Sequence, residues 1–432
     1  MSDATRVLAI SVESAEPKLV RRLMARGELP VLARLAQSSA WIPLAPDPYV
    51  GSVPQWPSIT SGLLPQQHRR LYGPWLWDPE QMRIAAHTPE PLTPVWTRSG
   101  ASSIGIFDVP AIAASASPGG FVVRGWGSHN PLDHELVVEP SEAADALGER
   151  HPFECAHEID FKTGERAGVL SELSTDSLRG IRMRGAAGQR LLRRFRPELA
   201  FVNFPELHRA GHWLWHTVEP DDPLYASLPD SVRSMPVGVE ELYRETDRQI
   251  GVLLDEVGPD ADVFVYGFNG MEPGHGIPDF LRSVLIGTGY ARIAKLRTAA
   301  LPRRAFAAVK ARAPARLKEA YYARLPSDVT LRLAQHLPDY DWSATRAFAM
   351  PSEQNGWIRL NVAGREAAGV VDARDYETVG DELEEMLRSL TSTSGEPVVR
   401  NVARTDANDV LPDLIVHWAP AAHGEIARLN GQ

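Results

Sequence analysis

Residues 239–270 read VEELYRETDRQIGVLLDEVGPDADVFVYGFNG and combine two secondary-structure patterns in one stretch. Apolar residues first recur at the spacing of an amphipathic helix, and the run VFVY that follows is short, apolar and rich in β-branched and aromatic side chains. A helix that leads into a buried strand is the repeating unit of parallel sheets. The stretch therefore predicts an α/β fold.

The same alternation occurs elsewhere in the chain. RVLAISVE (6–13) is strand-like, PKLVRRLMARGELPVLARLAQSS (17–39) has helical spacing with Pro17 in its first turn, and ASSIGIFDVP (101–110) and LLRRFRPELAFVNFPE (191–206) repeat the pattern. We expect a doubly wound, mainly parallel sheet sandwiched by helices.

In such sheets the functional residues gather at the carboxyl ends of the strands. This rule predicts one rim that carries Glu13, Glu206, His208, Phe268 and Asn269.

Residues 291–340 interrupt the alternation with a basic, alanine-rich helical stretch. We expect a core at 1–290, a helical cap insertion at 291–340, and a return to the core at 341–432. The last part has short strands, an amphipathic helix in DARDYETVGDELEEMLRSL and a final strand in LPDLIVHWAP.

Composition limits the classes of partner. The 45 Lys and Arg residues face 55 Asp and Glu residues, for a net charge of -10, so there is no basic field for nucleic acid. No window of about 18–20 residues is apolar enough for a membrane helix, and the first residues do not resemble a signal peptide. We expect a cytoplasmic protein with a small-molecule substrate, and Cys155, the single cysteine, agrees with a reducing compartment.

Two short segments carry candidate chemistry. Ser52 begins the turn-rich segment SVPQWPSITSGLLPQQH (52–68), where it is either a functional hydroxyl group or a turn residue bonded to a backbone amide. HRAGHWLWH (208–216) spaces His208, His212 and His216 four residues apart, which on a helix places three imidazoles on one face. His216 is either a metal ligand or a packing residue.

These segments, with LAISVES (8–14), VFVYGFNGMEP (263–273) and the later DWSATRAFAMP, GWIRLNVAGRE and LPDLIVHW, resemble in their order the type I phosphodiesterase/nucleotide pyrophosphatase branch of the alkaline phosphatase superfamily. The resemblance implies that Ser52 is the nucleophile, activated by a divalent metal ion. His129 and Asn130 fall where the family chain approaches the substrate cleft, so with Asn269 they are candidate substrate-binding residues.

The chain departs from the family's metal-ligand pattern. An Asp is replaced by Glu13, the Asp of an Asp-x-x-x-His motif by His208, and an Asp-His pair by Phe268 and Asn269, while His212 is retained. A phenyl ring cannot bind a metal ion. We expect Glu13, His208 and His212 to hold at most one divalent metal ion, zinc or manganese, or none.

Two hypotheses follow. In the first, the chain is a diverged enzyme for a small phosphorylated or other oxyanionic metabolite, with Ser52, His208 and His212 as catalytic residues in a one-metal or metal-free centre. In the second, it is a catalytically inactive pseudoenzyme that binds or scaffolds. The retained functional side chains favour the enzyme.

Overall fold

The computed structural model describes residues 5–44, 52–70, 75–86, 91–110, 117–127, 136–152, 167–226, 228–273, 280–294, 340–352, 355–405 and 410–419. The chain forms two compact units. The first comprises Met1–Ala45, Ile59–Gly62 and Pro91–Pro273, and the second comprises Pro46–Ser58, Leu63–Glu90 and Gly274–Gln432. Each unit has a hydrophobic core of its own.

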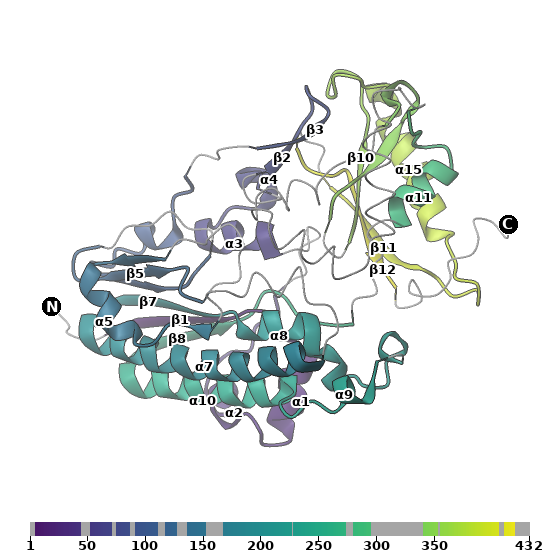
Figure 1. Cartoon of the computed structure of the whole chain (residues 1–432). Coiled ribbons are helices and arrows are strands. Elements are labelled where there is room, and N and C mark those ends of the chain that lie inside the picture. The colour runs from purple at the N-terminus through teal and green to yellow at the C-terminus, as the bar shows by residue number, and fades with distance from the viewer. Residues whose placement is uncertain are drawn as a thin grey trace. The chain divides into compact units, whose positions relative to one another are not determined.

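The first unit contains a six-stranded sheet in the order β6-β5-β4-β7-β1-β8 (Figure 1). All neighbouring strands are parallel except β6, which is antiparallel to β5. The strands are β1 Val7–Val12, β4 Ile104–Phe107, β5 Phe121–Arg124, β6 Val137–Glu139, β7 Leu199–Phe204 and β8 Asp262–Tyr266.

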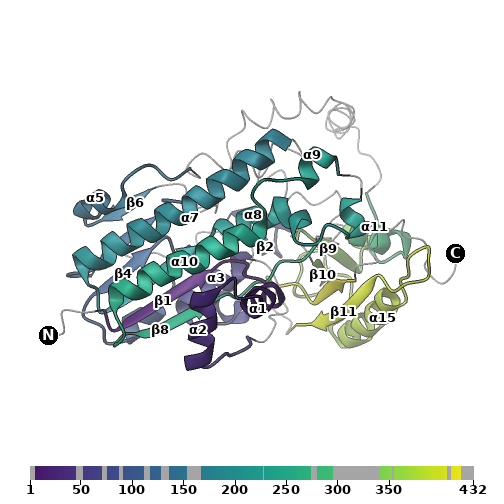
Figure 2. The same ribbon diagram turned by 90° about the horizontal axis from the view of Figure 1, so that it is seen from below.

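The first unit also contains helices. They are α1 Pro17–Ala25, α2 Pro30–Ser38, α5 Ala144–Leu147, α7 Ala167–Phe195, α8 Glu206–Leu214, α9 Asp230–Arg233 and α10 Val239–Val257. The long helices α7 and α10 run side by side along one face of the sheet in both views (Figures 1 and 2). Alternate strand residues such as Leu8, Ile10 and Val202 enter the same buried core as Ile181 of α7 and Leu253 of α10. The predicted α/β class with a mainly parallel central sheet flanked by helices is confirmed.

The stretch 17–39, which its periodicity predicted as one helix, forms two. α1 starts with Pro17 in its first turn, and the Glu16 side chain caps it by accepting a hydrogen bond from the Lys18 amide at 3.1 Å. Gly27 then takes a positive φ of 74° and Pro30 begins α2. A left-handed glycine followed by proline ends one helix and starts another, although the apolar spacing continues across the break.

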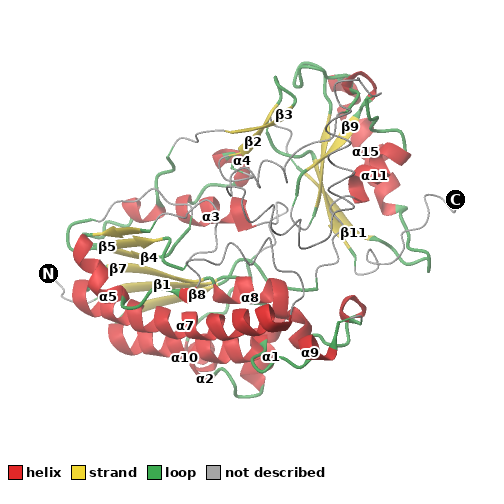
Figure 3. Ribbon diagram, in the orientation of Figure 1, coloured by secondary structure: helices red, strands yellow, loops and turns green. Residues whose placement is uncertain are grey.

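The second unit is built on antiparallel pairs (Figure 3). One sheet has the order β11-β12-β10-β9, and a separate hairpin pairs β2 with β3. Its elements are α4 Pro65–His68, β2 Trp75–Asp78, β3 Arg83–Ala86, α11 Phe280–Gly287, β9 Ala347–Met350, β10 Gly356–Leu360, α15 Tyr376–Arg388, β11 Val399–Arg404 and β12 Leu414–Trp418. The predicted amphipathic helix and final strand are α15 and β12.

The boundaries expected at 290 and 340 stay a prediction, because residues 295–339 of the expected cap lie outside the described residues. None of the helices in the described ranges is long and apolar enough to cross a membrane.

A buried ion pair joins the sheet of the second unit to the segment that follows β10. Asp413 receives two hydrogen bonds from Arg365, at 2.6 and 2.7 Å, and one each from the Tyr376 hydroxyl group at 2.9 Å and the Leu360 amide at 2.7 Å. The carboxylate is only 2% exposed. Such a fully hydrogen-bonded buried charge is tolerated only while each partner remains.

Candidate functional site

Glu13 and His208 form a buried hydrogen-bonded pair in the first unit. Glu13 directly follows β1, and His208 lies in the first turns of α8, which begins immediately beyond β7. Because β1 and β7 are parallel neighbours, both residues reach the same end of the sheet. The Oε2 atom of Glu13 lies 2.9 Å from Nδ1 of His208, and the two residues are 3% and 6% exposed.

Asn203, the fifth residue of β7, holds the other oxygen of Glu13. Its Nδ2 atom donates to Oε1 of Glu13 at 2.7 Å and to the backbone carbonyl of Asp108 at 3.1 Å, while Ser11 donates to its Oδ1 atom. Ser11, Asn203 and Tyr266 occupy one row across three strands. Burial raises the pKa of Tyr266 to about 12, while its hydrogen bond with Ser11 acts in the opposite direction. Three polar residues therefore lie side by side on neighbouring strands, and Asn203 connects them to Glu13.

Asp108 and Arg184 form a second buried pair beside the first. Asp108 follows β4 with a positive φ of 58°, and its carboxylate accepts hydrogen bonds from the amides of Trp126 at 3.0 Å and Gly127 at 2.8 Å. Arg184, from the middle of α7, donates from Nη1 to Asp108 at 3.0 Å. Its guanidinium group also lies over the rings of Phe107 and Trp126, 5.3 and 5.4 Å from their centroids.

Glu206, the first residue of α8, completes this cluster. Its Oε1 atom accepts a hydrogen bond from Nε of Arg184 at 2.7 Å and lies 3.2 Å from Nε2 of His151. Burial acts to raise the pKa of Glu206, but the charge of Arg184 and the contact with His151 outweigh it, so the pKa is lowered. Burial lowers the pKa of His151, which keeps its ring neutral near pH 7.

The other histidines of HRAGHWLWH occupy different surroundings. The His212 ring is exposed and lies against that of His208, with the centroids 4.8 Å apart. α8 ends at Leu214, so His216 lies in the following 3-10 turn, Trp215–Thr217, and not on the same helical face. There its Nε2 atom contacts the Val232 carbonyl at 2.9 Å. This contact supports the interpretation of His216 as a packing residue.

The loop after β8 carries Phe268 and Asn269 and is anchored to Glu16, the N-cap residue of α1. Its Met271 amide donates to the Glu16 carboxylate at 3.2 Å, and a Cβ atom on Gly211 of α8 would meet the Met271 side chain at 2.7 Å. The Oδ1 atom of Asn269 is buried and has no hydrogen-bond partner among the described residues. The loop therefore lies against both α1 and α8, the helices next to the Glu13–His208 pair.

Other predicted site residues belong to the second unit or lie outside the described residues. Ser52 is the first residue of α3 (Ser52–Ser61), belongs to the second unit, and its side chain is not among those described. His129 and Asn130 lie outside the described ranges. The predicted roles of Ser52, His129 and Asn130 stay predictions. In the second unit, Nε2 of His68 contacts the Ser58 hydroxyl group at 3.0 Å.

The donor groups near Glu13 do not fit a metal centre of the kind that the resemblance implies. Glu13 directs one oxygen to His208 and the other to Asn203, and Glu206 is bonded to Arg184. Within the ranges that the structure describes, no group of three or more His, Cys, Asp or Glu side chains is arranged to hold a metal ion. A structural zinc site needs four protein ligands and a catalytic site three.

Sequence reasoning missed Asn203, Asp108 and Arg184. The first two had a signal, since each is a polar residue within or just after an apolar strand, in AFVNF and IFDVP. A buried strand tolerates such a group only when it is hydrogen-bonded, so it indicates a partner nearby. Arg184 had no such signal, because one basic residue among several on a long helix resembles a solvent-exposed side chain.

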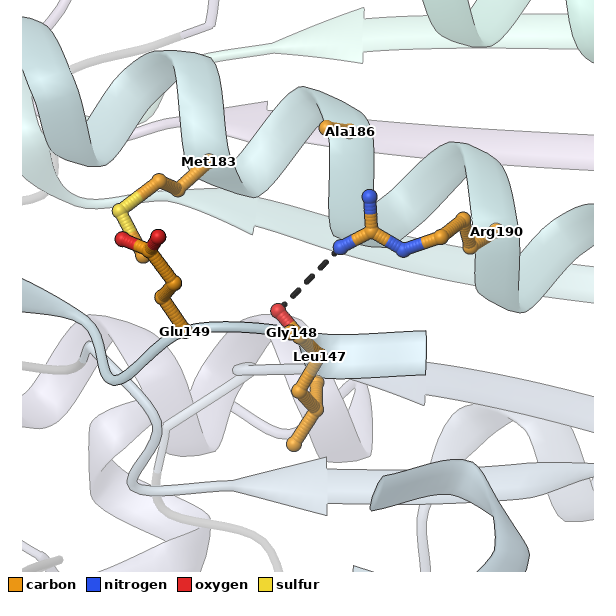
Figure 4. A pocket seen from close by; sticks show the side chains of 6 residues that line it. All are labelled: Leu147, Gly148, Glu149, Met183, Ala186 and Arg190. Atoms are coloured by element: carbon orange, nitrogen blue, oxygen red, sulfur yellow. Dashed lines mark hydrogen bonds between the residues drawn. The ribbon is translucent and has the colours of Figure 1, made fainter. Parts of the chain in front are cut away.

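A hollow of about 430 Å³ lies on the first unit between the end of α5 and α7 (Figure 4). It is lined by Leu147, Gly148, Glu149, Met183, Ala186 and Arg190. Arg190 supplies its positive charge, but this side chain already donates to the carbonyls of Ala146 at 2.7 Å and Leu147 at 3.3 Å. The guanidinium group thus serves to cap the end of α5, and no predicted site residue lines the hollow.

Comparisons with known proteins give the family and the fold. The family model described as type I phosphodiesterase / nucleotide pyrophosphatase matches residues 7–417. Among solved structures, the chain is similar to the phosphonoacetate hydrolase from Sinorhizobium meliloti 1021 in complex with phosphonoformate, with 14% identity, 98% of this chain and 83% of that chain covered, and a TM-score of 0.52. The same hydrolase in complex with phosphonoacetate gives 15% identity, the same coverage and a TM-score of 0.48. No curated protein matches the chain.

Proposed function

The chain belongs to the type I phosphodiesterase/nucleotide pyrophosphatase family, and from this premise we propose that it is a diverged enzyme acting on a small phosphorylated or other oxyanionic metabolite. Its centre uses the Glu13–His208 pair as a general acid–base device. The observation that carries the proposal is the buried contact of 2.9 Å between Oε2 of Glu13 and Nδ1 of His208.

The pair has the geometry that general acid–base catalysis requires. The ionised carboxylate of Glu13 has no proton to donate and can only accept hydrogen bonds. Its contacts with Asn203 and His208 therefore place the proton of the His208 ring on Nδ1. In that tautomer Nε2 is the basic atom of the ring. When it takes a proton from an attacking hydroxyl group or water molecule, the neighbouring carboxylate stabilises the imidazolium ion that forms.

Ser52 supplies the nucleophile by its place in the family's motif, and His212, whose ring lies against that of His208, supplies a second imidazole at the exposed side of the pair. A metal ion bound by a family member would activate the nucleophile and stabilise the leaving oxygen. The donor set around Glu13 does not fit that role, so the proposal assigns the proton transfer to His208 and the stabilising charge to Glu13.

The substrate class follows from the family and is supported by the relatives. The hydrolase of similar fold is described in complex with phosphonoformate, a small phosphonate. We accordingly propose a substrate of that size with a phosphoryl, phosphonyl or comparable oxyanionic group. Asn269, with a buried amide oxygen that has no partner among the described residues, is the proposed acceptor for a substrate hydroxyl or amine group.

A panel of small phosphate monoesters, phosphate diesters and phosphonates tests the proposal, with each assay run in a chelator and again in added zinc or manganese. We expect the protein to turn over at least one substrate in the presence of the chelator. His208→Gln should lower the kcat of that reaction by on the order of 10²-fold or more. His417→Gln, a half-buried histidine of β12 in the second unit, is the matched control and should retain full activity.

Two outcomes contradict the proposal. Turnover that His208→Gln leaves unchanged removes the acid–base role of the pair. Absence of turnover on the whole panel, combined with tight binding of one of its members, favours the pseudoenzyme hypothesis instead.

A further inference from the structure

Six buried residues of the first unit form a closed ring, in which Arg184 lies opposite the Glu13–His208 pair. The residues are Glu13, Asp108, Arg184, Asn203, Glu206 and His208, and each is at most 6% exposed. From Arg184, the first half of the ring leads through Asp108 and Asn203 to Glu13, and the second half leads through Glu206 to His208. We infer that Arg184 is a positioning residue: its hydrogen bonds to Asp108 and Glu206 fix the position of Glu13 relative to His208.

The first half of the ring runs along the sheet. Arg184 donates from Nη1 to the Asp108 carboxylate at 3.0 Å, and the Asp108 carbonyl accepts from Asn203 at 3.1 Å. The same Asn203 amide nitrogen donates to Glu13 at 2.7 Å. Three residues at or near the ends of neighbouring strands are thus joined by hydrogen bonds in a fixed order.

The second half runs through α8. Arg184 donates from Nε to Glu206 at 2.7 Å, and Glu206 is the first residue of the helix. His208 is two residues further, within the same first turns, and closes the ring at Glu13. A shift of the helix start would therefore move His208 relative to the sheet.

The guanidinium group suits this task because its donors point in fixed directions. Arginine presents several N–H groups in one plane, whereas lysine presents a compact ammonium group that cannot hold two carboxylates in fixed geometry. Side chains close around it: a Cβ atom on Gly127 would meet Nη2 of Arg184 at 2.5 Å. The rings of Phe107 and Trp126 cover the group as well. Arg184 is therefore confined to one arrangement.

The ring gives a spectroscopic signature that does not depend on catalysis. A histidine Nδ1 proton held by a carboxylate in a buried site resonates downfield, and His208→Gln assigns the signal because it removes that proton. We expect Arg184→Met to abolish the His208 signal or shift it upfield. Arg184→Lys, which keeps the charge, should shift it in the same direction by less.

A control separates positioning from general loss of stability. Leu253→Ala removes a fully buried side chain of α10 in the same hydrophobic core and outside the ring. We expect it to lower the melting temperature while the His208 signal stays at its position. If Arg184→Met does not fold, Asp108→Asn, which keeps the side-chain shape and removes the ion pair, gives the same test.

Three results would overturn the inference. The first is a folded Arg184→Met protein whose His208 signal is unshifted, and the second is an Arg184→Lys protein whose signal lies at the wild-type position. The third is a Leu253→Ala protein whose signal is shifted as far as that of Arg184→Met. The link to turnover rests on the proposed function. Where turnover exists, Arg184→Lys should lower kcat with little change in KM. A protein without turnover contradicts the proposed function and leaves the spectroscopic test of the ring intact.

Discussion

The carboxylate of Glu13 and the imidazole of His208 meet at 2.9 Å although the two residues are 195 positions apart in the chain. Two parallel strands, β1 and β7, carry them to the same end of the sheet, where the carboxyl ends of the strands lie. Burial makes the contact chemically significant, because a hydrogen bond to a charged group is stronger in surroundings of low dielectric constant. The pair is therefore the first target for substitution.

Glu13→Gln tests the charge of the pair. The amide keeps nearly the same shape but cannot stabilise an imidazolium ion, so we expect kcat on a substrate from the panel to fall by on the order of 10²-fold or more. Substrate binding should change little. Steady-state kinetics on the purified variant checks this, with Glu28→Gln, an acidic residue of the first unit that pairs with Arg244, as the control. Equal kcat values for wild type and Glu13→Gln would contradict the proposed role.

Gly185→Ala tests the close packing of α7 on α10. A Cβ atom at this position would lie 2.0 Å from Oε1 and 2.8 Å from Cβ of Gln249, whose amide also donates to Glu245 at 2.8 Å. Overpacking of this kind costs ~1–3 kcal/mol. Urea denaturation should show that loss in the free energy of unfolding.

Gly168→Ala provides the control on the same helix, since nothing lies within 4 Å of its added Cβ atom. It should be neutral or stabilising by up to ~1 kcal/mol, because alanine is the better helix former. If the two alanine variants were equally stable, the helices would not be packed as closely as the structure shows.

Much of the first unit could be predicted from local patterns. Apolar runs and helical spacing identify β1, β7 and α10, and the rule that strand ends converge places Glu13 and His208 together. The break between α1 and α2 depends on Gly27, with its positive φ, and on Pro30, and neither residue interrupts the hydrophobic spacing. The contact of Arg184 with Asp108 joins residues 76 positions apart and has no local signal. Tertiary pairing decides such contacts.

The stability of the first unit should fall in mild acid because of His151. Burial puts its folded-state pKa below the unfolded value of about 6.5. Below that pH the unfolded chain takes up a proton that the folded protein does not, so the free energy of unfolding falls as pH decreases. One such group contributes up to ~1.4 kcal/mol per pH unit.

His151→Gln keeps a hydrogen-bond donor for Glu206 and removes the titration. We expect its stability to depend less steeply on pH than that of the wild type between about pH 6.5 and 5. The lowered pKa of Glu206 acts in the same direction but closer to pH 4, where an unfolded glutamate titrates. Denaturation curves at a series of pH values measure how the free energy of unfolding of each protein depends on pH. Equal slopes for wild type and His151→Gln would show that His151 titrates alike in the folded and unfolded chains.

Asp413→Asn should destabilise the second unit by roughly 3–5 kcal/mol. It removes the carboxylate that accepts two hydrogen bonds from Arg365, so that Arg359 and Arg365 are left to share the single carboxylate of Glu366. Asp381→Asn is the matched control: its carboxylate also pairs with an arginine, Arg404, but is 78% exposed. Exposed ion pairs contribute ~1 kcal/mol or less. Thermal denaturation followed by circular dichroism compares the two, and a similar small loss in both would argue against a buried pair at Asp413.

The last prediction concerns metal binding at the loop after β8. By the resemblance, Phe268 and Asn269 replace an Asp-His pair of metal ligands, and neither a phenyl ring nor a neutral amide supplies the charge that a dication needs. The double replacement Phe268→Asp with Asn269→His restores both donors, and Phe268→Leu with Asn269→Gln changes the same positions without adding any. We expect elemental analysis and calorimetry to find gained zinc or manganese binding only in the first of these proteins.

Activity should follow the metal. Metal activation of a nucleophile is worth several kcal/mol, and about 1.4 kcal/mol is tenfold in rate, so the Asp-His protein should hydrolyse an activated aryl phosphodiester faster than the wild type by several orders of magnitude. Added metal should not raise the rate of the wild type. Robust metal-dependent turnover by the unmodified protein that Ser52→Ala abolishes would instead show that the family's two-metal mechanism has been retained, with ligands other than those around Glu13.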